Sequence, residues 1–158
     1  MKDLVVTGIA AGVLGTIAMD LLNILFSRAG LILRIDITMI GRMSAGWSRG
    51  RFYYSHPGEM EPAANEQAIG YISHYLIGVC LAVPFVVGWG AIVEGPVSPA
   101  WIFAYGIATT VASVLVVYPL MGLGLFGRRS PEGIRGPLSS LANHIFFGAG
   151  MAASVVIV

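Results

Sequence analysis

Four long apolar runs divide the chain, and each is long enough to cross a lipid bilayer. They cover residues 4–26, 68–93, 100–123 and 138–158. Because a helix rises about 1.5 Å per residue, about 20 apolar residues span the ~30 Å hydrocarbon layer. The pattern predicts an all-α, multi-pass membrane protein. Its single four-helix transmembrane domain would occupy residues 1–158.

The connection between the first two runs, residues 27–67, contains a shorter apolar pattern of its own. In the stretch LILRIDITMIGRM, Ile32, Ile35, Met39 and Met43 recur at helical spacing. The stretch is too short and too charged to span a bilayer. It therefore predicts an amphipathic helix that lies at the membrane interface.

Composition and charge support a lipid environment and give an orientation. The chain is 56% hydrophobic and 11% charged, with a mean hydropathy of +0.81, whereas soluble domains carry about 25% charged residues. Of the nine basic residues, all except Lys2 lie in the connections 27–67 and 124–137. The positive-inside rule makes these connections cytoplasmic and places both termini outside. A net charge of +1 argues against nucleic acid as a partner, because phosphate binding needs clustered basic surface.

Two pairs of runs resemble each other, which predicts a duplication. In the second and fourth runs, GYISHYLIG around His74 aligns with SLANHIFFG around His144. In the first and third, TGIAAGVLGT aligns with YGIATTVASV, and this register sets Asp20 opposite Tyr118. Both halves would run in the same direction. The prediction is a 2+2 parallel pseudo-repeat about an axis along the membrane normal.

Each run brings a polar or ionisable residue to a similar depth, about 8–10 Å inside the cytoplasmic boundary. One residue comes from each run: Asp20, His74, Tyr118 and His144. Further polar residues accompany them: Thr16, Asn23 and Asn143. An aspartate within a span costs roughly 2.5–3.5 kcal/mol, so it requires a partner, and histidine is the nearest candidate. These residues together predict an intramembrane site for a substrate or for protons.

Charged residues close to the boundary predict the cytoplasmic mouth of this site, at Glu66, Arg42 and Arg128. Glu66 precedes His74 by eight residues, about 12 Å along a helix axis, so the two cannot bind one ion. Glu66 is expected to cap the second span or to line the mouth.

Three functions are compatible with this pattern. The first is a small transporter or permeation protein in which Asp20 and a histidine exchange protons, since histidine titrates near neutral pH. Its cargo would be small or amphipathic, and a homodimer would help to enclose the pathway. The second is a structural or accessory subunit, in which the polar residues only join helices. No nucleophile–base pair is apparent, so the sequence favours a protein that is not an enzyme.

The third function is a haem or metal protein. His74 and His144 at equal depth on two helices are the arrangement that a bis-histidine haem needs in a four-helix bundle. Glycines one turn away would make room for the macrocycle. Alternatively, the two histidines and Asp20 would bind a divalent metal ion with one open position.

Three stretches carry a resemblance to a known family. They are E-x-x-x-G-Y-x-x-H-Y-x-x-G over Glu66–Gly78, the preceding GRMSAGWSRGRF, and NHIFFGAGMA from Asn143. Together they resemble the DUF2938 family of bacterial inner-membrane proteins, over nearly the whole chain. The family is one of unknown function. The resemblance implies a four-helix protein of the bacterial inner membrane and supplies no catalytic residues.

Overall fold

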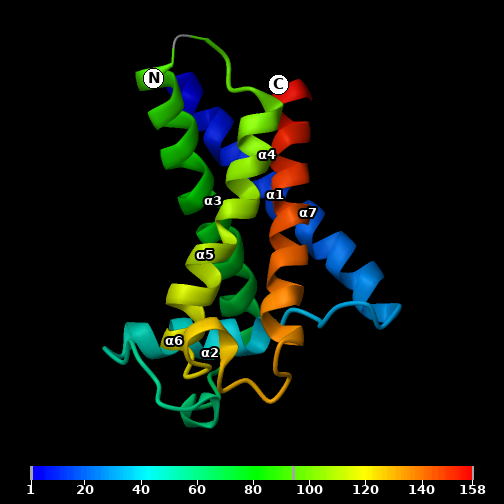
Figure 1. Ribbon diagram of the computed structural model, residues 1–158. Helices are drawn as coiled ribbons and strands as arrows, with labels where there is room; N and C mark the ends of the chain where they lie inside the picture. The colour runs from blue at the N-terminus through cyan, green and yellow to red at the C-terminus, as the bar shows by residue number, and fades with distance from the viewer. Residues whose placement is uncertain (1, 94, 158) are drawn as a thin grey trace.

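The computed structural model describes residues 2–93 and 95–157, and all the regular structure within them is helical. Four helical rods are long and apolar enough to cross a membrane: α1 (Lys2–Arg28), α3 (Glu66–Ile92), the third rod Pro99–Leu120, and α7 (Arg135–Ile157). Both ends of the chain lie at one end of the bundle, and the two long connections lie at the other (Figure 1). We call these the terminal end and the loop end. The predicted all-α class with four helices able to span a membrane is confirmed.

The third rod is not a uniform α-helix. It begins as α4 (Pro99–Ala108) and α5 (Thr110–Ala112), passes through a π-helical turn at Ser113–Val117, and ends as α6 (Tyr118–Leu120). Proline at the first helical turn fits, because that turn needs no intrahelical N–H partner. Short π-helical turns are frequent at functional sites.

The helix in the first connection starts later than predicted. α2 covers Ile37–Ser48, and the preceding residues 31–36 are not helical. Asp36 sets this start, because its carboxylate accepts a 2.9 Å hydrogen bond from the Met39 backbone N–H and caps the helix. The helical prediction for Ile32 and Ile35 was therefore wrong. A short 3₁₀ turn, Pro57–Glu59, and another, Leu125–Gly127, complete the loop end.

Close backbone contacts at glycines join the helices. α1 packs against α3 and α7, α7 also packs against α4, and α2 crosses α3. At these crossings a Cβ atom would meet the neighbouring helix, so only glycine allows the observed approach. The glycines concerned are Gly12, Gly15, Gly41, Gly70, Gly78, Gly106, Gly148 and Gly150.

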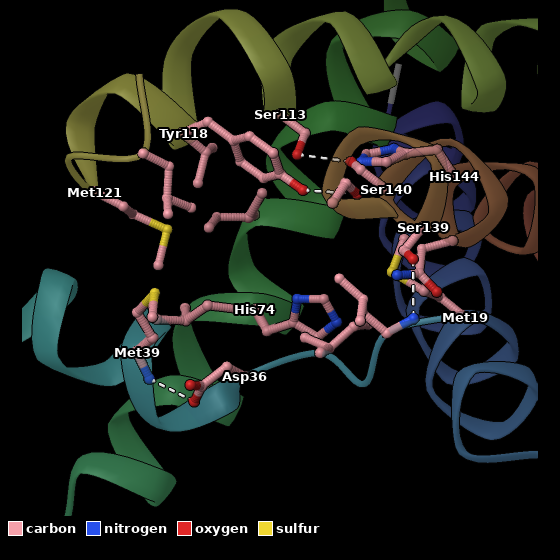
Figure 2. A pocket seen from close by; sticks show the side chains of 18 of the residues that line it. Met19, Asp36, Met39, His74, Ser113, Tyr118, Met121, Ser139, Ser140 and His144 are labelled. Atoms are coloured by element: carbon pink, nitrogen blue, oxygen red, sulfur yellow. Dashed lines mark hydrogen bonds between the residues drawn. The ribbon is translucent and has the colours of Figure 1, made fainter. Parts of the chain in front are cut away.

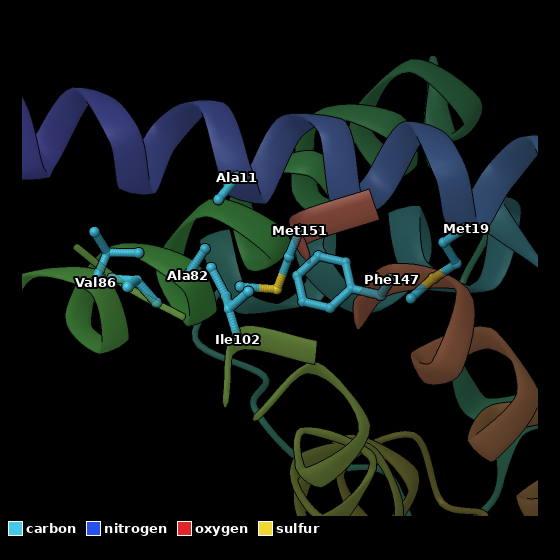
Figure 3. Packing of buried hydrophobic residues seen from close by; sticks show 8 residues of the cluster. Ala11, Met19, Ala82, Val86, Ile102, Phe147 and Met151 are labelled. Atoms are coloured by element: carbon cyan, nitrogen blue, oxygen red, sulfur yellow. The ribbon is translucent and has the colours of Figure 1, made fainter. Parts of the chain in front are cut away.

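The largest buried apolar cluster lies where the four rods meet (Figure 3). Its members include Ala11 and Met19 of α1, Ala82 and Val86 of α3, Ile102 of α4, and Phe147 and Met151 of α7. A second cluster, of Met43, Tyr54, Met60 and Met121, joins α2 to the loop end of the third rod. The two clusters fix the rods on either side of the candidate site.

The glycine contact between α2 and α3 gives a stability prediction. Gly70→Ala would place a methyl group against the Ile37 backbone carbonyl, so α2 must move. We expect the free energy of unfolding in detergent to fall by about 1–3 kcal/mol, as for other overpacked sites. Gly88→Ala on the same helix is the matched control, because nothing lies within 4 Å of its added Cβ. The control should be neutral or stabilising by about 0.5–1 kcal/mol. Equal stability of the two variants would contradict the described contact.

Candidate functional site

A cavity of about 520 Å³ lies between α3 and the third rod, at the loop end of the bundle. Small-molecule sites commonly measure about 300–1,000 Å³. Side chains from α1, α2, α3, the third rod and α7 line it, together with residues 33–36 and 130–132. His74 of α3 and His144 of α7 both contribute to its wall (Figure 2). Four of the lining side chains are methionines: Met19, Met39, Met43 and Met121.

Asp20 and His74 form the hydrogen-bonded pair on one side of the cavity. His74 Nε2 lies 3.1 Å from Asp20 Oδ1, and the two side chains are 13% and 17% exposed. His74 lines the cavity, whereas Asp20 lies behind it on α1. An ionised carboxylate can only accept a hydrogen bond, so the Nε2 atom carries the proton when Asp20 is ionised, and in the neutral ring the Nδ1 atom is an acceptor. The imidazole ring of His74 therefore lies between the cavity and the Asp20 carboxylate.

His144 has a different partner, Thr109, which the sequence did not single out. His144 Nδ1 lies 2.8 Å from Thr109 Oγ1, and the Thr109 hydroxyl donates to the Gly106 carbonyl. Because that hydroxyl proton is already used, His144 Nδ1–H is the donor and Nε2 remains an acceptor. The sequence feature that could have indicated this contact is a threonine within the third apolar run.

Tyr118, which the predicted repeat aligns with Asp20, makes its hydrogen bond to α7. Its hydroxyl donates a 3.0 Å hydrogen bond to the Gly136 carbonyl at the start of α7. Nearby, the Ser140 hydroxyl donates to Ser113 Oγ at 2.9 Å. Tyr118 therefore belongs to the wall between the third rod and α7.

Asn23 and Ser139 hold the segment of residues 31–36 across the loop end, and Asn143 bonds Asn23. Asn23 Nδ2 donates to Asn143 Oδ1 at 2.9 Å and to the Leu33 carbonyl at 3.0 Å. Asn23 Oδ1 accepts from the Ile35 backbone N–H at 3.1 Å, and Ser139 Oγ accepts from the Leu33 N–H at 2.9 Å. These contacts resemble those of a short strand, with side chains as the partner. Leu33 and Ile35 consequently form part of the cavity wall.

The predicted mouth residues do not line the large cavity. Arg42 binds Glu66 through two hydrogen bonds, of 2.8 and 2.9 Å, and Glu66 also accepts from the Ala63 N–H at 3.0 Å. The hydrogen bonds that Arg42 donates to the Glu66 carboxylate raise the pKa of Arg42 above its usual value, so the guanidinium stays charged. This pair fastens α2 to the start of α3, next to a smaller cavity of about 290 Å³ that Arg42 lines. Arg128 is exposed on the loop after the third rod.

Other residues, which the sequence did not single out, lie where the cavity meets the loop end. The charged ones are Arg34, Asp36 and Glu132. Thr16 was predicted and does line the cavity, with its hydroxyl donating to the Gly12 carbonyl at 2.8 Å. The position of the mouth depends on where residues 31–36 and 130–132 fold back, which apolar periodicity does not encode.

The glycines that were expected to make room for a haem are packed against neighbouring helices. Gly70 lies against Ile37, Gly78 against Thr16, and Gly148 against the Phe103 carbonyl. These three glycines therefore do not themselves open a space for a macrocycle. Within residues 2–93 and 95–157, no three His, Cys, Asp or Glu side chains lie close enough together to hold a metal ion.

Comparison with known families identifies the chain. The model of the DUF2938 family, described as a protein of unknown function, matches residues 9–158. The chain belongs to the DUF2938 family. No curated protein and no solved structure matches it. Every residue that lines the cavity lies within the DUF2938 match.

Aromatic side chains close this DUF2938 cavity toward the terminal end. Phe85 of α3 stacks on Tyr105 of α4, with ring centroids 4.2 Å apart and an interplanar angle of 16°. Tyr105 also donates a 2.8 Å hydrogen bond to the carbonyl of Leu81, a cavity residue. Beyond the stack, the ring centroids of Trp89 and Trp101 lie 6.2 Å apart. We call these four aromatic residues the aromatic contact.

The asparagine network of this DUF2938 protein gives a second prediction. Asn23→Ala leaves the Leu33 carbonyl and the Ile35 N–H without their partner. We expect faster amide hydrogen exchange at Ile35 and a free energy of unfolding lower by about 1–3 kcal/mol. Ser27→Ala is the control on the same helix, because Ser27 Oγ bonds only the Ile24 carbonyl of its own helix, at 3.3 Å. If Ile35 exchanges equally slowly in both variants, Asn23 does not hold this segment.

Proposed function

We propose that this DUF2938 protein is a small transporter or permeation protein with a ligand site in the 520 Å³ cavity and a proton site at Asp20 and His74. The proposal rests on where the cavity, His74 and Asp20 lie relative to one another. The cavity lies in a bundle of helices able to span a membrane, and the imidazole that lines it is hydrogen-bonded to a carboxylate behind it. Mostly apolar walls with a few convergent polar groups are typical of small-molecule sites.

The energetic balance favours a functional role for Asp20 over a purely structural one. An aspartate within a span costs up to roughly 2.5–3.5 kcal/mol on insertion scales, the value for the centre of the span. A hydrogen bond between membrane helices returns about 0.6 kcal/mol on average. The bond to His74 does not offset this cost, and glycine contacts already join α1 to α3. A group that binds and releases a proton explains a carboxylate at this position.

Opening toward the terminal end would require α3 and α4 to separate at the aromatic contact. Two irregular helical segments flank this place: Pro84 lies within α3, and the π-helical turn Ser113–Val117 lies within the third rod. Both disturb the regular i→i−4 hydrogen bonding and are common points of helix bending. We propose that protonation of the Asp20–His74 pair biases this separation.

The orientation and the internal repeat are part of the proposal. The loop end carries all the arginines, so the positive-inside rule makes it cytoplasmic and sets both termini outside, in the bacterial inner membrane. The packing of α1 with α3 and of α4 with α7 is what a 2+2 origin predicts, and α1 also packs against α7. α2 would lie at the cytoplasmic interface. Its Met39 and Met43 side chains line the cavity, so this face is turned to protein.

Cysteine accessibility tests the route through the cavity. Cys80 is the one cysteine of the chain, and it is exposed; replacing it by serine gives a background for Ser113→Cys in the cavity wall. A membrane-impermeant thiol reagent should label residue 113 from the loop side of vesicles. Adding Phe85→Ala and Tyr105→Ala should extend labelling to the terminal side, because the aromatic contact is removed.

The matched control is Tyr71→Ala, an aromatic residue of α3 that is 48% exposed and lies away from the cavity. It should leave labelling confined to the loop side. Absence of labelling from the loop side in every variant would refute the cavity as an entry site. Unchanged labelling after removal of Phe85 and Tyr105 would refute the aromatic contact as the barrier.

The proton site predicts a dependence on pH that Asp20→Asn removes. In the Ser113→Cys background, the labelling rate from the loop side is divided at each pH by the rate of a free thiol, which removes the titration of the thiol itself. This normalised rate, used for every variant, should change by at least about fivefold between about pH 5 and 8, which is the lower end of usual coupling. Asp20→Asn keeps a hydrogen-bonding side chain and removes the titratable group, so its rate should not respond. Asp3→Asn, in the first turn of the same helix, is the control and should respond like the parent protein. A pH response that survives Asp20→Asn would rule out Asp20 as the proton site.

A further inference from the structure

Four of the hydroxyls that line the cavity offer hydrogen-bond acceptors to a ligand, because their own protons are used within the protein. Three lining hydroxyls donate to backbone carbonyls, and a fourth donates to another hydroxyl. The donor–acceptor pairs are Thr16 to Gly12, Thr109 to Gly106, Tyr118 to Gly136, and Ser140 to Ser113. A hydroxyl whose proton is committed keeps its lone pairs, so it can only accept from a ligand.

The two histidines add acceptors to the same cavity. His74 uses its Nε2 atom toward Asp20, and His144 uses its Nδ1 atom toward Thr109. The second nitrogen of each neutral ring is an acceptor. Within the described part of the chain, no hydrogen bond reaches either of these second nitrogens. A ligand that donates hydrogen bonds would satisfy both.

The charges at the cavity favour a cation. Asp36 and Glu132 line it and form no ion pair among residues 2–93 and 95–157, and Arg34 is the one arginine or lysine in its described wall. Other arginines are directed elsewhere: Arg42 to Glu66, Arg49 to Glu61, Arg51 to Glu59, Arg129 to the Ser55 carbonyl and Arg135 to the Gly30 carbonyl. Asp20 adds a third carboxylate directly behind His74. Negative charge thus exceeds positive charge around the cavity.

The apolar part of the wall suits an organic body of variable shape. The four methionines come from α1, α2 and the end of the third rod, and Phe147 adds a ring from α7. Methionine is unbranched and polarisable, so it adapts to different apolar ligands.

We propose that the ligand of the cavity is an amphipathic amine in its ammonium form. Its N–H groups would donate to the histidine and hydroxyl acceptors, its charge would be balanced by the carboxylates, and its apolar body would contact the methionines. This inference rests on the proposed function and names the chemical class of its ligand.

Three matched probes test the charge preference: 1-naphthylmethylammonium, 1-naphthylmethanol and 1-naphthoate. They share one ring system and differ in their polar end. Binding is measured by calorimetry on the full chain in lipid nanodiscs, with protein-free nanodiscs subtracted to remove partitioning into lipid. We expect the ammonium probe to bind at least about tenfold more tightly than the carboxylate, because two unpaired carboxylates line the cavity.

Paired variants connect the preference to these carboxylates. Asp36→Asn with Glu132→Gln should reduce the ammonium preference to less than about threefold, and asparagine preserves the cap of α2. Glu59→Gln with Glu61→Gln removes the same amount of charge from exposed residues outside the cavity. This control should retain the full preference.

The outcomes separate the inference from the proposed function. Equal or tighter binding of 1-naphthoate overturns the amine ligand and leaves a ligand cavity in place. If the ammonium preference survives Asp36→Asn with Glu132→Gln, recognition of the amine by these two carboxylates is overturned. If none of the three probes binds, the cavity is not a ligand site, and both the inference and the proposed function are overturned.

Discussion

The close approach of helix backbones at glycine is the constraint on which this structure depends. Lipid gives little hydrophobic reason for helices to associate, so packing and hydrogen bonds between them must hold the bundle together. Gly12 and Gly78 bring α1 and α3 together, with Gly78 directly against Thr16. One turn further along these antiparallel helices, Asp20 meets His74. The polar pair therefore exists because the backbones beside it are close.

The same constraint explains where the cavity lies. In the described part of the chain, no glycine contact joins α3 to the third rod. These two rods are joined by bulky aromatic rings at the terminal end, and toward the loop end they remain apart. The helices thus pack closely around α1, whereas the interface between α3 and the third rod contains the cavity. The histidines and hydroxyls surround that cavity.

Much of the fold followed from the sequence, because a span is defined by apolar length alone. The Asp20–His74 contact was also foreseeable, since both residues lie at one depth on adjacent runs. The contact between His144 and Thr109 depends on the register that Gly106 and Gly148 give to α4 and α7, which depth does not determine. The start of α2 was missed because Asp36 was counted as a residue of the helix when it is the cap. The cavity could not be predicted from the sequence, because it is a space between several elements.

The π-helical turn of the third rod changes the angular register between the two halves of the proposed repeat. A turn closed by i→i+5 bonds holds one more residue than an α-turn. Beyond Ser113–Val117, counting along the chain and counting around the helix axis therefore differ by one position, about 100° of rotation. Tyr118, which an ungapped alignment equates with Asp20, corresponds in angle to the neighbouring position of α1. An alignment of the two halves becomes geometrically correct only with a one-residue gap at this turn.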